Sequence, residues 1–139
     1  MRIMAIDYGD AHTGIAISDP TGFLAGFTTV INAYRPEVVA EQVAALAKEH
    51  GVEELVLGHP INMDGTRGPR SEKAQAMKTL LEETTSLPVV LWDERRTTID
   101  AHQILMNSGK NAKKRKKVVD AVAATLILEG YLTYKKSHP

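Results

Sequence analysis

The stretch "IMAIDYGDAHTGIAIS", residues 3–18, predicts two neighbouring strands joined by a tight turn. An apolar run stops at Asp7, the glycines Gly9 and Gly14 flank a polar turn, and a second apolar run follows. Apolar runs separated by glycine-rich turns are typical of antiparallel strands. A carboxylate at the end of a buried strand needs a partner that offsets its lost hydration. For Asp7 that partner could be a turn amide, a cation, a phosphate-bound metal ion, or a metal ion shared with other carboxylates.

The remaining pattern predicts a three-stranded meander, followed by helices that alternate with two further strands. The predicted strands span residues 2–7, 14–18, 24–31, 54–58 and 89–92. The predicted helices begin at Pro36, at a capping Ser71, at Thr97 or Thr98, and near Lys117, and the last one extends to Tyr134. A meander followed by strand–helix–strand crossovers gives a mixed sheet with helices on its faces. We therefore expect an α/β fold with a mixed five-stranded sheet, three strands antiparallel and two parallel, in one domain over residues 1–139.

The composition is that of an ordinary globular chain, with 139 residues, 43% hydrophobic and 24% charged. The absence of cysteine excludes disulfides and thiolate metal sites and suits a reducing compartment, so we expect a cytoplasmic protein. No apolar stretch is long enough to span a membrane, and no signal-peptide pattern is present. The 17 basic and 17 acidic residues balance, so any indication of nucleic-acid binding has to come from local charge.

Acidic residues stand at the ends of elements that are predicted to be buried. Asp7 ends the first strand, Asp93 and Glu94 end the fifth, and Asp120 shares the apolar face of the last helix. The carboxyl ends of parallel strands form the edge at which open α/β sheets bind ligands, so Asp7, Glu94 and Asp120 are expected to converge there. Oxygen ligands favour Mg²⁺ or Mn²⁺, and two such ions can activate a water and stabilise the leaving oxygen of a phosphodiester.

Each of these acids also has a purely structural interpretation. Asp7 could bind the amides of its own turn, and Glu94 could pair with a neighbouring arginine. Asp120 lies near a helix start, where the helix dipole favours an acid.

The segment "KNAKKRKK", residues 110–117, carries six cations in eight residues. Such a run is suited to contact a phosphate backbone, although a solvated loop is the alternative interpretation. We expect a basic connector there, with Lys113, Lys114, Arg115 and Lys116 as nucleic-acid contacts. The segment "HPINMDGTRGPR", residues 59–70, is predicted to be an irregular loop because of its prolines and glycines, and it adds Arg67 and Arg70 to the same rim. The five histidines show no paired metal spacing, so surface or structural roles are expected of them.

Four segments together resemble the YqgF/RuvX family, which has a ribonuclease H-like fold. They are "AIDYGDAHTGIAISDP", "LGHPINMDGTRGPRS", "LWDERRTTIDAHQILMNSG" and "KKRKKVVDAVAATLILEGYL", and they cover nearly the whole chain. The family comprises metal-dependent nucleases, described as Holliday junction resolvases and as nucleases that process the 5′ end of pre-16S rRNA in ribosome biogenesis. The resemblance implies that Asp7, Glu94 and Asp120 are the catalytic acids and hold Mg²⁺ or Mn²⁺, two ions when substrate is bound. It further implies that Arg95 and Thr97 line the substrate groove.

The chain departs from the family pattern in two places. The first motif often has a basic pair before its second glycine, where this chain has Ala11 and His12. The family's Gly-Leu-Pro is here Gly58-His59-Pro60. Neither change removes an acid, but the first leaves open whether the turn contacts phosphate.

Two other functional classes stay open at this point. The segment "DYGDAHTG" also resembles the first phosphate loop of actin-like ATPases and sugar kinases, although those proteins clamp a nucleotide between two such domains. The other class is a nucleic-acid-binding module in which the acids are present but catalyse no reaction. Junction resolution needs two coordinated sites and hence a dimer, whereas RNA trimming can be done by a monomer, so a monomer or weak homodimer is expected.

Overall fold

The computed structural model describes residues 1–22, 25–59, 68–93 and 112–137, with only the backbone described for residues 112–120 and 137. The elements are β1 (Arg2–Asp7), β2 (His12–Ser18), β3 (Ala25–Asn32), α1 (Pro36–His50), β4 (Val52–His59), α2 (Pro69–Thr85), β5 (Val89–Asp93) and α4 (Ala112–Ser137). The sheet order is β3-β2-β1-β4-β5. The pairs β1–β2 and β2–β3 are antiparallel, and β1–β4 and β4–β5 are parallel. The predicted mixed five-stranded sheet is confirmed.

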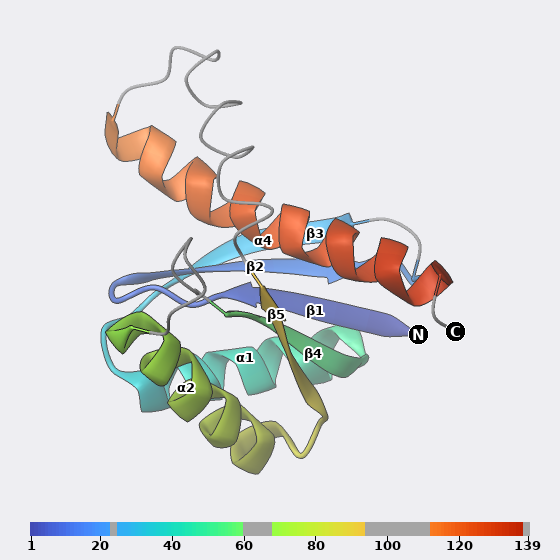
Figure 1. Ribbon diagram of the computed structural model, residues 1–139, viewed down its shortest axis with the longest axis horizontal. Coiled ribbons are helices and arrows are strands. Elements are labelled where there is room, and N and C mark those ends of the chain that lie inside the picture. Colours follow the sequence, from blue (N-terminus) through green and yellow to red (C-terminus); the bar gives the residue numbers. More distant parts are fainter. Residues whose placement is uncertain (23–24, 60–67, 94–111, 138–139) are drawn as a thin grey trace.

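Helices cover both faces of the sheet, α1 and α2 on one and α4 on the other (Figure 1). The central strand β1 is therefore apolar on both sides, as expected for a strand buried on two faces. Met4 and Ile6 belong to the core under α1 and α2, whereas Ile3 and Ala5 belong to the core under α4. Successive residues of β1 therefore point to opposite faces of the sheet.

The turn between β1 and β2 depends on glycine. Asp7 pairs with Gly14 across the two strands. A Cβ added to Gly9 would lie 2.3 Å from the carbonyl oxygen of His12, so any larger residue would force the turn open. The turn therefore holds Asp7 and the start of β2 close together.

The start of α2 differs from the prediction. The helix begins at Pro69, with Gly68 as its N-cap residue, so Ser71 lies inside the helix and does not cap it. The Ser71 hydroxyl is fully buried and lies 2.6 Å from Nε2 of His59. Proline is pre-organised for the first helical position, so Pro69 begins a helix where an irregular loop was predicted. The rest of that predicted loop, residues 60–67, lies outside the described residues.

The prediction of a basic connector before the last helix is also wrong, because α4 already begins at Ala112. Alanine, lysine and arginine are strong helix formers, and no glycine or proline interrupts residues 112–129. Most of the cationic run therefore forms the first turns of the helix. The helix predicted to follow Thr97 or Thr98 lies outside the described residues. None of the helices in the described ranges has the length and apolarity needed to cross a membrane.

The C-terminal half of α4 is fixed to the amino end of β4. The Tyr131 hydroxyl donates a hydrogen bond to the Glu54 carboxylate. Lys135 Nζ lies 3.3 Å from the same carboxylate and 5.5 Å from the centre of the Tyr131 ring. Burial, then the hydrogen bond to Glu54 and its charge, raise the pKa of Tyr131 well above its usual range. The phenol is thus held protonated, and the contact sets where α4 lies along the sheet.

Tyr131→Phe should lower the free energy of unfolding by about 1.5–3 kcal/mol, the net value of a hydrogen bond to a charged group. Because the folded state holds the Tyr131 proton more tightly, its contribution is complete below the unfolded pKa of about 10 and is lost as the pH rises through the folded pKa. The free energy of unfolding, measured with urea at about pH 8 and about pH 10.5, should fall less between these two pH values in the variant than in the wild type. Tyr34→Phe is the control, because Tyr34 is 80% exposed and should change neither value. Equal alkaline losses in wild type and Tyr131→Phe would contradict this role for the phenol.

Candidate active site at the carboxyl edge of the sheet

The three parallel strands end at the same edge of the sheet. Their last residues are Asp7 in β1, His59 in β4 and Asp93 in β5. Ile6 is in register with Leu57, and His59 with Asp93. The edge predicted to hold the site therefore exists, and Asp7 lies at its centre.

Asp7 lies on the face of the sheet that α4 covers. The alternation from Ile3 and Ala5, which pack under α4, carries on to Asp7. Asp7 is only partly buried, and its cross-strand partner Gly14 has no side chain to fill the neighbouring space. The Asp7 carboxylate is therefore partly exposed beside a position that carries no side chain.

The direction of α4 brings its N-terminal half toward this edge (Figure 1). Tyr131 is anchored at Glu54, which pairs with Ile3 at the start of β1. Asp120 precedes Tyr131 by eleven residues, about 16 Å of helix, and Asp7 lies about 13 Å along the strand from Ile3. The two acidic positions are thus displaced by similar distances from the same anchor.

Helical spacing also puts position 120 in line with the residues of α4 that pack on the sheet. These residues are Ala124, Ile127, Leu128 and Tyr131. The backbone of Asp120 thus lies in line with the α4 residues that pack on the sheet, and its convergence with Asp7 stays a prediction. The Asp120 side chain lies outside the described residues.

The remaining predicted site residues are not described by the structure. Glu94, Arg95, Thr97 and Arg67 lie outside the described ranges, as do the side chains of Lys113, Lys114, Arg115 and Lys116. In sequence, Glu94 directly follows Asp93, the last residue of β5. Among described residues no three His, Cys, Asp or Glu side chains are grouped so that they could hold a metal ion. Of the predicted metal ligands, Asp7 alone has a described side chain.

Three polar contacts at this edge were not predicted from the sequence. His12 Nδ1 lies 2.6 Å from Asn32 Oδ1, and His12 alternates onto the same face as Gly14 and Asp7. An imidazole thus takes the place of the family's basic pair. His59 is 6% exposed, and its contact with Ser71 joins the end of β4 to the first turn of α2, which is a structural role.

The third contact joins the β1–β2 turn to α2. Lys73 Nζ lies 3.2 Å from Asp10 Oδ1, and both border a small pocket that Tyr8 and Arg70 also line. Burial, then the charge of Asp10, raise the pKa of Tyr8, with Lys73 acting in the opposite direction. The Tyr8 phenol therefore stays protonated and can donate a hydrogen bond. Arg70 was considered as a rim residue, but nothing in the sequence singled out Lys73.

The chain matches known proteins over nearly its whole length. The model of the RuvX family, described as Holliday junction resolvase, matches residues 1–134. A Halothermothrix orenii protein named "Putative pre-16S rRNA nuclease" is 44% identical over 135 residues, 97% of this chain and 96% of the relative. A Bacillus subtilis protein of the same name is 43% identical over 134 residues, 95% of this chain and 97% of the relative.

Solved structures show the same architecture. The Thermus thermophilus RuvC in complex with a Holliday junction substrate superposes with a TM-score of 0.62 at 13% identity, over 98% of this chain and 96% of that one. At that identity the likeness concerns the fold, and it confirms the predicted ribonuclease H-like class. The match to the family model, over residues 1–134, shows that the chain belongs to the RuvX family, described as Holliday junction resolvase.

Proposed function

We propose that this protein is a metal-dependent nuclease that hydrolyses phosphodiester bonds of structured nucleic acid at the carboxyl edge of its sheet. The observation that carries the proposal is the place of Asp7, which ends the central strand, faces α4 and adjoins the side-chain-free Gly14. The names of the relatives favour the 5′ end of pre-16S rRNA in ribosome biogenesis, and the family description favours Holliday junctions. Both substrates present the same phosphodiester bond for hydrolysis, and a cytoplasmic location is part of the proposal.

The proposed metal ligands are Asp7, Glu94 and Asp120. The donor set fits Mg²⁺ or Mn²⁺, because it consists of carboxylate oxygens and Asp7 is only partly buried. When bound, such ions supply Lewis-acid activation of a water and stabilise the leaving oxygen. The chain's own residues hold and orient the nucleic acid, for which we assign Arg95, Thr97, Arg67, Lys113, Lys114, Arg115 and Lys116 to backbone contacts.

Cleavage should require Mg²⁺ or Mn²⁺ and should be weak with Ca²⁺. The larger Ca²⁺ takes more ligands in looser geometry and does not align water and phosphate as an octahedral ion does. The measurement is single-turnover cleavage of a labelled four-way DNA junction and of a pre-16S rRNA leader fragment across a titration of each metal. Full activity in excess chelator would contradict a metal mechanism. Tight binding of both substrates with no cleavage under any metal would instead indicate the non-catalytic module.

A further inference from the structure

We infer that Tyr8, Arg70 and Lys73 form a second phosphate-binding position, which holds a nucleic-acid backbone phosphate that flanks the one being cleaved. This inference rests on the proposed function and adds to it the path of the substrate strand over the edge of the sheet. The three residues belong to the turn after β1 and to the first turns of α2.

The pocket adjoins Asp7 but lies on the other face of the sheet. It is lined by Tyr8, Asp10, Gly58, Arg70, Lys73 and Ala74. Tyr8 directly follows Asp7 and packs against the core under α1 and α2, whereas Asp7 lies on the α4 face. Gly58 is one residue beyond Leu57, the β4 partner of Ile6, so it lies beside Asp7 at the end of the strands. A strand that crosses the edge at Asp7 would therefore meet the pocket next.

The charges of the pocket favour an anion. Arg70 and Lys73 are three residues apart on α2 and so lie on one side of the helix. Both stand near the N-terminus of α2, where the helix dipole disfavours cations. Lys73 pairs with Asp10, but Arg70 has no ion-pair partner in the part of the chain that the structure describes. The unbalanced charge of Arg70, beside the Tyr8 hydroxyl donor, is what a phosphate would satisfy.

The ion pair between Lys73 and Asp10 can break when substrate binds. The side chains of Lys73 and Asp10 are 59% and 72% exposed, and exposed ion pairs add little stability. The pocket volume of about 10 Å³ is room for about one water, so it cannot enclose a base or a sugar. The pocket therefore suits a phosphate held at its rim, without readout of base identity.

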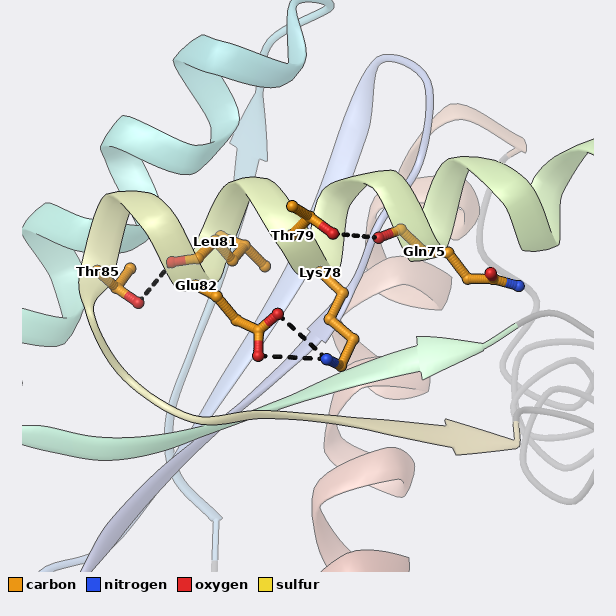
Figure 2. A network of polar contacts seen from close by, with 6 residues as sticks. All are labelled: Gln75, Lys78, Thr79, Leu81, Glu82 and Thr85. Atoms are coloured by element: carbon orange, nitrogen blue, oxygen red, sulfur yellow. Dashed lines mark hydrogen bonds and ion pairs between the residues drawn. The ribbon is translucent and has the colours of Figure 1, made fainter.

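The test compares Arg70→Ala and Lys73→Ala with Lys78→Ala. Lys78 lies on the same helix and makes a similar ion pair, 3.1 Å from Glu82, but it is five residues farther from the edge (Figure 2). The probes are a fluorescent four-way DNA junction and a fluorescent pre-16S rRNA leader fragment, bound to the full chain in chelator at several salt concentrations. Loss of one phosphate contact should reduce the log–log salt slope by about one. Between about 50 and about 200 mM salt, each pocket variant should then lose about threefold less affinity than wild type. Lys78→Ala should match wild type.

Asp10→Asn tests the same pocket with a change that should strengthen binding. Removing the carboxylate releases Lys73 for the substrate, so affinity at low salt should rise. Wild-type slopes in Arg70→Ala and Lys73→Ala, with wild-type cleavage preserved, would overturn the pocket and leave the proposed function standing. Failure of the wild-type chain to bind either probe would overturn both. Thermal melts of all four variants identify any effect that comes from unfolding.

Discussion

Asp7→Asn should reduce single-turnover cleavage by about a thousandfold, which corresponds to about 4 kcal/mol of lost transition-state stabilisation. The amide keeps the shape of the side chain and removes the charge that would help to hold the metal ions. Asp7 ends the central strand on the face covered by α4, so no other described acid can take its place there. The measurement is cleavage of either substrate at saturating Mg²⁺ and enzyme.

The same substitution should leave folding intact. Without metal, its melting temperature should equal or exceed that of the wild type, because one charge is removed from the proposed group of acids, which would repel one another. Asp19→Asn is the matched control, since Asp19 follows β2 at the opposite edge of the sheet and accepts a hydrogen bond from Thr21. Cleavage near the wild-type rate in Asp7→Asn would rule out the assignment, whereas Asp19→Asn should cleave normally.

Replacement of Lys113, Lys114, Arg115 and Lys116 by alanine should cause the largest loss of nucleic-acid affinity. If each residue contacts one phosphate, the log–log salt slope should fall by about four units. Alanine is the best helix former, so the first turns of α4 should persist in the variant. Cleavage at saturating substrate should fall much less than affinity, because none of the four residues is assigned to the chemistry. The measurement pairs binding isotherms at several salt concentrations with single-turnover cleavage.

The helical start of α4 gives this experiment a second readout. Lys116 lies one helical turn before Asp120, so the cationic run and the proposed ligand belong to one helix. A parallel drop in turnover would show that the run also positions Asp120. An unchanged salt slope would show that the four cations are only solvated, and the groove would then have to be sought around Arg67, Arg70 and Arg95. Lys48→Ala, an exposed change in the last turn of α1, is the control for charge alone.

The sheet could be predicted because its signals are local. Glycine-flanked apolar runs define the meander, and crossover rules leave few orders for the strands that follow. The α1 boundaries were equally predictable, since Pro36 opens the helix and Gly51 ends it with φ 67°. Ser71 was misassigned as a cap because its hydroxyl is taken by His59, a tertiary partner that no local pattern reveals. The start of α4 was misplaced because a lysine-rich run without glycine or proline is compatible with loop and helix alike.

In the candidate site, too, features set by local sequence could be predicted and features set by tertiary contacts could not. Asp7 could be predicted from one feature, an acid at the end of a buried strand, and the structure places it on the expected edge. The pocket on the other face could not be predicted, because Lys73 and Asp10 are 63 residues apart and meet only through the orientation of α2. Long-range ion pairs of this kind depend on helix packing, which periodicity alone does not determine.

The central claim, that the carboxyl edge of this sheet is a metal-dependent nuclease site, is tested most directly by cleavage assays on one preparation. Wild type and Asp7→Asn would be incubated side by side with the pre-16S rRNA leader and the four-way DNA junction, with Mg²⁺ and with chelator. The account predicts that the wild type cleaves at least one substrate with Mg²⁺ and neither with chelator, and that Asp7→Asn cleaves neither. Cleavage by Asp7→Asn at the wild-type rate, or cleavage that survives the chelator, would contradict it.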